Sequence, residues 1–229
     1  MFLVIGSFGF FVLPTSTLEN GFYESNTMEW AQILGTVLVY RFMILADFGT
    51  EDVFQYWFPL NNSRILVRIS DLPNLNSSMC TEWYIENIGD SGKVKVSSIS
   101  SMHIIYSLRS ILERTLSKLI FPIGDWEFFD DHFENELTIM DEEGEYPRYY
   151  RYQGKSYDES IYTFMAGWYQ QESDVGMYIS SSYGEIEKST GIPNFISHYW
   201  LFLHPNGFDY EIILTRTQFE DIKESAWEL

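Results

Sequence analysis

The residues with the clearest chemical character are ten carboxylates in the 21 residues from Asp125 to Glu145. They are Asp125, Glu127, Asp130, Asp131, Glu134, Glu136, Asp141, Glu142, Glu143 and Glu145. No Lys or Arg lies between Lys118 and Arg148, so these side chains have no counter-charge nearby in the sequence and repel one another. Because such repulsion destabilises a fold, it invites an explanation by function. Recognition of a basic protein is one, since charges around an interface raise the association rate and select the partner.

Four tyrosines follow the acidic stretch, in the segment Tyr146-Pro-Arg-Tyr-Tyr-Arg-Tyr152. Tyr and Arg are enriched at interface hot spots, because rigid aromatic side chains bury a large area at a low cost in entropy. We therefore predict a partner-binding surface made of the ten carboxylates and Tyr146, Tyr149, Tyr150 and Tyr152. In the alternative interpretation the acids are a solvated helix face and loop, and the tyrosines form a strand with Tyr149 facing the core and Tyr150 facing outward.

Two further uses of the acidic stretch are a mimic of a phosphate backbone and a cation site. The cation site is disfavoured because the chain has neither a D-x-[DN]-x-[DN]-G loop nor an H-E-x-x-H motif. The four histidines, His103, His132, His198 and His204, are scattered, and Cys80 is the only cysteine. These counts exclude an intrachain disulfide, make a structural zinc site improbable and favour a reducing compartment. We expect no metal and no cofactor.

Signatures of catalysis are weak in this chain. It contains no G-x-S-x-G, P-loop or dinucleotide-binding motif. A glycoside hydrolase needs two carboxylates about 5–10 Å apart in a cleft, but 33 acidic residues make a suitable pair easy to find by chance. We therefore assign no catalytic residue, and an enzyme is less favoured than a binding module.

The overall composition excludes several classes of protein. The chain of 229 residues has 33 Asp and Glu against 14 Lys and Arg, a formal charge of −19. Direct binding of nucleic acid or of an anionic membrane needs clustered positive charge, so neither is expected. Hydrophobic residues make up 45% and aromatic residues 18%, which is too apolar for a disordered chain.

The N-terminal segment, residues 1–27, is of uncertain order. Its first 13 residues are apolar, but no Lys or Arg precedes Arg41 and no A-x-A cleavage site follows. The run is also shorter than the roughly 20 residues that a membrane span needs. We expect a cytoplasmic protein, with export or membrane insertion through residues 1–13 as the alternative. A further interpretation places the natural start at Met28.

Residues 28–229 are predicted to form a single α+β domain, with two lobes meeting near 122–125 as an option. The expected fold is a mostly antiparallel sheet built from hairpins, with one long amphipathic helix at about 101–119 and two or three shorter helices. The long helix is indicated by one apolar stripe: Ile104, Leu108, Ile111, Leu112, Leu116 and Leu119. The shorter helices are expected at 125–135, 157–171 and 217–227.

Alternating and β-branched patterns predict the strands. The run 36–46 indicates a buried strand, and 176–183 a further one. Three hairpins are expected, each around a turn-forming segment. They join 52–58 to 64–70, 81–87 to 93–99, and 199–203 to 208–215.

An acidic, aromatic, cysteine-poor domain without catalytic signatures has the general character of proteins that neutralise a basic partner. Immunity proteins against bacterial toxins and protein mimics of nucleic acids share this character, an analogy of class and not of sequence. We therefore predict an acidic protein-binding module, of inhibitor or immunity type, that neutralises a basic partner such as a toxin or a nucleic-acid-binding protein. The alternatives are a hydrolase with paired carboxylates in a cleft, and a structural or assembly protein.

Overall fold

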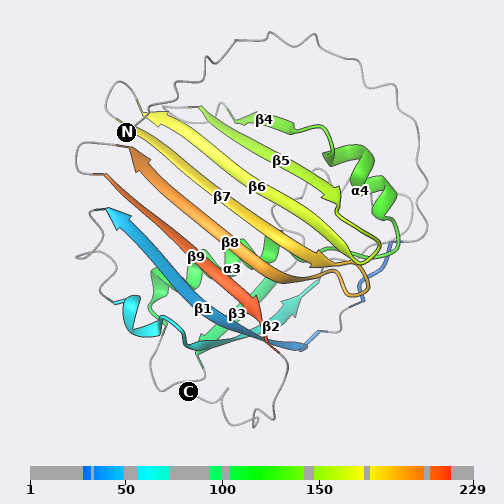
Figure 1. Cartoon of the computed structure of the whole chain (residues 1–229), viewed down its shortest axis with the longest axis horizontal. Helices are drawn as coiled ribbons and strands as arrows, with labels where there is room; N and C mark the ends of the chain where they lie inside the picture. Colours follow the sequence, from blue (N-terminus) through cyan, green and yellow to red (C-terminus); the bar gives the residue numbers. More distant parts are fainter. Residues whose placement is uncertain are drawn as a thin grey trace.

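The fold is a single large antiparallel sheet with helices on one face (Figure 1). The computed structural model describes residues 28–31, 34–48, 56–72, 93–98, 104–141, 147–172, 176–203 and 207–217. In chain order the elements are β1 (Val37–Phe48), the 3-10 helix η1 (Phe58–Leu60), β2 (Arg64–Asp71), β3 (Lys93–Ser98), α3 (Tyr106–Lys118), α4 (Trp126–Phe133), β4 (Leu137–Asp141), β5 (Arg148–Ser156), β6 (Ile161–Glu172), β7 (Gly176–Glu187), β8 (Ile192–Leu203) and β9 (Phe208–Arg216).

The nine strands are ordered β3-β2-β1-β9-β8-β7-β6-β5-β4. Strands β4 to β9 form a meander in which each strand pairs with the next, and β1 to β3 form a second meander. Pairing of β9 with β1 joins the two meanders into one sheet. Both described α-helices belong to the connection between β3 and β4, and Figure 1 shows α3 behind the sheet.

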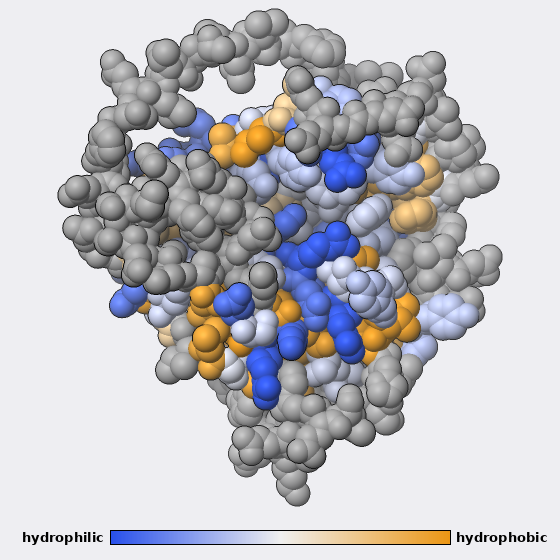
Figure 2. All heavy atoms as spheres, turned by 180° about the vertical axis from the view of Figure 1, so that it is seen from behind, coloured by the Kyte–Doolittle hydropathy of each residue, from blue (hydrophilic) through white to orange (hydrophobic). Residues whose placement is uncertain are grey.

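Each strand divides its side chains between two faces, because successive residues point to opposite sides. We call the face that packs against α3 and α4 the helix-side face and the other the open face. On β6, Tyr162, Phe164 and Ala166 are buried on the helix-side face. From behind, Figure 2 shows hydrophilic side chains over the region of α3, with hydrophobic side chains beside them. The core therefore lies between the sheet and the inner sides of the helices.

Small residues on β7 let α3 approach the sheet. Ser180, Ser182 and Gly184 occupy successive helix-side positions. A Cβ atom at Gly184 would lie 3.1 Å from a methyl carbon of Leu119, just after the helix. Because these positions lack bulk, the buried stripe of α3, which includes Leu112, packs close to the strand.

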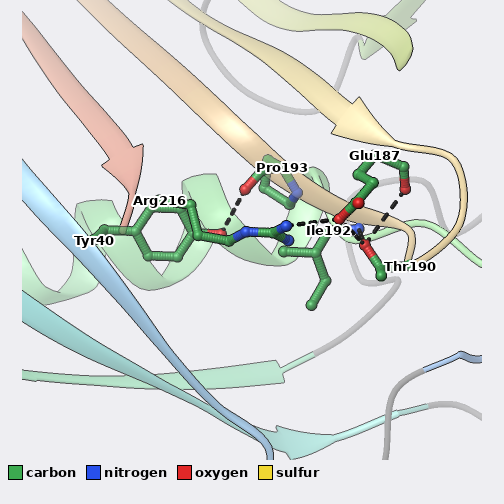
Figure 3. Close-up of polar contacts among 6 residues, drawn as sticks. All are labelled: Tyr40, Glu187, Thr190, Ile192, Pro193 and Arg216. Atoms are coloured by element: carbon green, nitrogen blue, oxygen red, sulfur yellow. Dashed lines mark hydrogen bonds and ion pairs between the residues drawn. The ribbon is translucent and has the colours of Figure 1, made fainter. Parts of the chain in front are cut away.

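A polar cluster ties four strands together at one end of the sheet (Figure 3). Arg216 of β9 lies 2.6 Å from Glu187 of β7, and Thr190 donates a hydrogen bond of 3.0 Å to the same carboxylate. Next to it, the hydroxyl of Tyr40 on β1 donates to the main-chain oxygen of Pro193, at 2.8 Å. The end of β7 is thus held by the end of β9, and the start of β8 by β1.

The prediction of an α+β fold is wrong. The described residues form a nine-stranded sheet with only two α-helices, both short. In the region of the expected long helix, 101–119, the structure has a 13-residue helix that begins at Tyr106. The expected helix at 157–171 is mostly strand β6. The residues that suggested a helical stripe lie on both faces of this strand. Positions 218–227 of the expected C-terminal helix lie outside the described residues.

The strand predictions were more accurate than the helix predictions, but one predicted strand pairs with a different partner. The run at 36–46 is β1, and the alternating hairpin around residues 204–207 is confirmed as β8 and β9. The run at 64–70 is β2, but β2 pairs with β1, and Phe58–Leu60 is a 3-10 helix. Residues 1–27 and 81–87 lie outside the described residues.

Candidate functional site

Helix α4 carries the first half of the acidic stretch. Its N-cap is Asp125, as the sequence predicts: the carboxylate accepts a hydrogen bond of 3.1 Å from the main-chain N–H of Phe128. The inner side of the helix is buried through its three phenylalanines, Phe128, Phe129 and Phe133. Glu127 and Asp131 are exposed on the outer side. Burial of the aromatic side therefore determines which acids the helix presents to solvent.

Strand β5 supplies counter-charges that the sequence does not reveal. The ammonium of Lys155 forms a salt bridge with Glu134, and this bond raises the pKa of Lys155. The Nε atom of Arg151 lies 3.4 Å from a carboxylate oxygen of Glu136. Asp130 accepts a hydrogen bond of 2.5 Å from the main-chain N–H of Ser156. Three of the predicted site acids therefore hold α4 and its following residues against β5.

The remaining predicted acids lie at and beyond β4. Asp141 is the last residue of β4 and stands directly across from Arg148 of β5. The predicted site residues Glu142, Glu143, Glu145 and Tyr146 lie outside the described residues.

The described tyrosines of the predicted site fall on both faces of β5. Tyr150 and Tyr152 are on the helix-side face, and Tyr152 is only 7% exposed. Burial raises the pKa of the Tyr152 hydroxyl to about 12. Tyr149 is on the open face, where its ring stacks on that of Tyr169 at 4.7 Å. This is the reverse of the alternative orientation considered from the sequence. A partner at the open face would meet Tyr149, whereas Tyr152 is part of the core.

The open face next to Tyr149 combines aromatic and charged groups. The guanidinium of Arg151 lies over the Tyr169 ring, 5.0 Å from its centre. The same guanidinium is the one beside Glu136. From β6 across β5 to the start of β4, the open face thus carries a stacked pair of tyrosine rings, then a guanidinium over one of them, then the carboxylate beside that guanidinium.

Charge is distributed unevenly between the sheet and the rest of the chain. Of the 14 Lys and Arg, 12 have described side chains, but of the 33 Asp and Glu only 16 do. The described part is therefore close to neutral, and most of the charge of −19 belongs to residues outside it. The acids of α4 and β4 stand out because they are close together, not because the whole sheet is acidic.

A second feature is an open groove of about 520 Å³ at β1, β8 and β9, near η1. It is lined by Ile44, Leu45, Phe58, Tyr199, Asp209, Tyr210 and Glu211. Asp209 and Glu211 are two residues apart on β9 and so share the open face. Ser197 donates a hydrogen bond of 2.6 Å to Glu211. Sequence analysis missed this pair of carboxylates, although the alternation of β9 places both on the polar side of the strand.

A buried polar group lies between the sheet and α3. Nδ1 of His198 is 2.9 Å from the hydroxyl of Ser182 and 3.3 Å from that of Thr115. Burial, together with the positive charges of Lys118 and Arg114, lowers the pKa of His198 to about 4. The imidazole is therefore neutral at pH 7. Because all three side chains are buried, this serine–histidine pair is sealed from any substrate in this conformation.

Among the residues that the structure describes, no three His, Cys, Asp or Glu side chains gather so as to hold a metal ion. Within the same residues no helix has both the length and the apolarity to cross a bilayer. Comparison of the chain with known protein families, with curated proteins and with solved structures finds no match.

Proposed function

We propose that the protein is an acidic binding module, of inhibitor or immunity type, that recognises a basic protein. Its docking surface, which we call the acidic surface, lies on α4, on β4 and on the residues between them, and consists of Glu127, Asp131, Glu134, Glu136 and Asp141. The observation that carries the proposal is the arrangement of α4. The helix buries its phenylalanines against the sheet and leaves Glu127 and Asp131 exposed.

The mechanism of such a protein is electrostatic capture followed by steric blocking. Carboxylates at an interface increase the encounter rate with a basic partner, and the effect weakens as salt screens the charges. On the open face, the stacked Tyr149 and Tyr169 lie beside Arg151, which pairs with Glu136, and would contribute rigid aromatic area at that end of the acidic surface. The single cysteine agrees with action in the reducing cytoplasm, which is part of the proposal.

The experiment compares two double charge reversals with equal net charge. Glu127→Lys with Asp131→Lys changes the acidic surface, and Glu29→Lys with Glu159→Lys changes two exposed acids elsewhere. A partner captured by the unaltered chain from its native host is purified and titrated at low and moderate salt. We expect the first pair to weaken binding by tenfold or more, and the control pair by about twofold. Equal effects of the two pairs, or an affinity independent of salt, would contradict the proposal.

The groove supports a second candidate, a hydrolase. Asp209 and Glu211 are adjacent on one face of β9, so their Cα atoms are about 7 Å apart. That spacing is compatible with the paired carboxylates of a glycoside hydrolase. The test is hydrolysis of a panel of oligosaccharides by the full chain and by Glu211→Gln. This candidate requires turnover that the substitution abolishes; lack of turnover by the unaltered chain excludes it for those substrates.

A further inference from the structure

The two edges of the sheet are protected to different degrees. A strand at the edge of a sheet leaves a row of backbone N–H and C=O groups unpaired, and proteins usually guard it with lysines, bulges or short length. At one edge, β3 carries the exposed Lys95, and the register of β2 with β3 shifts between Ile69 and Asp71. Both are common guards against pairing with another chain.

The opposite edge, β4, is short, at five residues, but has neither a lysine nor a shift in register. Its sequence, Leu-Thr-Ile-Met-Asp, contains no lysine and no proline, and its pairing with β5 runs without a shift in register. Ile139 is 41% and Met140 47% exposed, and they point to opposite faces of the sheet. Figure 1 shows β4 as the outermost strand beside β5. An added strand would find apolar side chains on both of its faces.

Charges at the two ends of β4 indicate which kind of strand fits. Glu136 precedes the strand and lies beside Arg151 of β5, and Asp141 ends the strand across from Arg148. Directly opposed residues in neighbouring strands are about 5 Å apart, so a cation on an added strand would meet each carboxylate at close range. On each face of the sheet, a cation of β5, an acid at one end of β4 and a cation of the added strand would then follow one another.

We propose that β4 is the docking edge for an extended basic segment of the partner, which joins the sheet as a further strand. The inference rests on the proposed function, and it specifies how the basic partner is held. In antiparallel pairing, the segment has cations opposite Asp141 and Glu136, five residues apart, and an apolar residue opposite Ile139. Main-chain hydrogen bonds provide affinity, and the side-chain positions provide selectivity.

A second copy of the chain fits this edge less well. Antiparallel pairing of two β4 strands centred on Ile139 places Leu137 of each copy across from Asp141 of the other. Because β4 contains no Lys or Arg, a second copy brings no cation of its β4 strand to Asp141 or Glu136. A basic segment places a cation opposite each of these carboxylates, so the edge favours it over a second copy.

The test uses a defined peptide with the full chain. The probe is the capped peptide Lys-Val-Val-Thr-Val-Lys, and its matched control has Glu at both ends. Amide hydrogen exchange in β4 is measured with each peptide at low and high salt. We expect the lysine peptide to slow exchange in β4 by about tenfold at saturation, less at high salt, and the glutamate peptide to have no effect. No protection by the lysine peptide, or equal protection by both peptides, overturns the proposal.

Two variants test whether the protection by the lysine peptide depends on the edge strand β4. Ile139→Lys adds the guard that β3 already has, and it should abolish protection by the lysine peptide. Leu45→Lys is its control, because Leu45 is 50% exposed on the inner strand β1. If Ile139→Lys does not fold, Glu136→Gln with Asp141→Asn should reduce peptide affinity at least threefold. Unchanged protection in these variants, or a dimer of the free chain that Ile139→Lys dissociates, contradicts a basic partner strand at β4.

The outcome is separable from that of the proposed function. If the captured partner binds Ile139→Lys normally but not the Glu127 and Asp131 reversal, the acidic surface stands and strand addition fails. If neither substitution changes binding, both proposals fail.

Discussion

The hydroxyl of Tyr162 on β6 donates a hydrogen bond of 3.1 Å to the main-chain oxygen of Phe129 in α4. This contact fixes the helix that carries Glu127 and Asp131 against the sheet. It is possible because Gly154 of β5 lies beside the tyrosine: a Cβ atom at Gly154 would stand 2.2 Å from the hydroxyl oxygen. Burial raises the pKa of Tyr162, and the nearby carboxylate of Asp130 raises it further, so the hydroxyl remains a donor.

The first prediction is that Gly154→Ala destabilises the protein by about 1–3 kcal/mol, because the new methyl group forces Tyr162 or α4 to move. Gly184→Ala is the matched comparison. Its nearest neighbour is the flexible side chain of Leu119 at 3.1 Å, so its cost should be smaller. Urea denaturation measures both. In a Tyr162→Phe background the cost of Gly154→Ala should fall; an unchanged cost would show that the hydroxyl is not what limits the space.

Local signals in the sequence predicted α4 correctly. Asp125 is the N-cap, and the phenylalanine spacing gives the buried side. The same kind of reasoning predicted β8 and β9, because the polar and apolar residues of β9 alternate along the strand. Where one face of a helix or strand is buried and the other is exposed to solvent, the period of its hydrophobic residues is visible in the sequence.

Strand β6 could not be recognised in this way, because both of its faces are apolar. Tyr162, Phe164 and Ala166 face the helices, while Ile161 and Met165 lie on the open face. With apolar residues at odd and even positions, the period of two is hidden, and Ile161, Met165 and Trp168 by chance have helical spacing. The α+β prediction failed largely for this reason.

The charge balance of the candidate site also depends on contacts between distant residues. Lys155 is 21 residues from Glu134 in the sequence, yet it is the ion-pair partner. Arg151 reaches Glu136 because β4 and β5 form a hairpin. A scan along the sequence finds no cation in the acidic stretch, but the hairpin brings two of them to it.

The second prediction concerns His198 and pH. Its pKa is lowered to about 4, whereas an unfolded histidine has a pKa near 6.5. Between these values the unfolded state binds more protons than the folded state, so stability falls as pH drops from 6.5 to 4 and this contribution levels off below pH 4. The full effect is about 3 kcal/mol. Urea denaturation between pH 7 and pH 4 measures it.

The control for this prediction is His198→Asn, which keeps a polar group near Ser182 but does not titrate. The variant should be less stable than the wild type at pH 7, and the difference should shrink as pH approaches 4. A difference that stays constant over this range would mean that His198 does not contribute to the acid sensitivity of the fold.

The third prediction concerns the ion pair of Glu187 and Arg216 (Figure 3). The hydrogen bond from Arg216 lowers the pKa of Glu187, so the stabilisation is present above the normal glutamate pKa and is lost as pH falls through the lowered value. Both side chains are about 30% exposed, so Arg216→Gln should cost only about 0.5–1 kcal/mol at pH 7. Thermal unfolding at pH 7 and pH 3 measures the change, which should be much smaller at pH 3. Glu185→Gln, at a neighbouring open-face position, should cost less at pH 7.

The fourth prediction compares two acids of the acidic surface by the kinetics of partner binding. Asp131→Asn and Glu134→Gln each remove one negative charge, so each should lower the association rate at low salt by about twofold. Their dissociation rates should differ, because Glu134 already pairs with Lys155 and must give up that bond to contact the partner. We therefore expect Asp131→Asn to speed dissociation more than Glu134→Gln does. Surface plasmon resonance with the purified partner separates the two rates, and a faster dissociation with Glu134→Gln would show that the partner displaces Lys155.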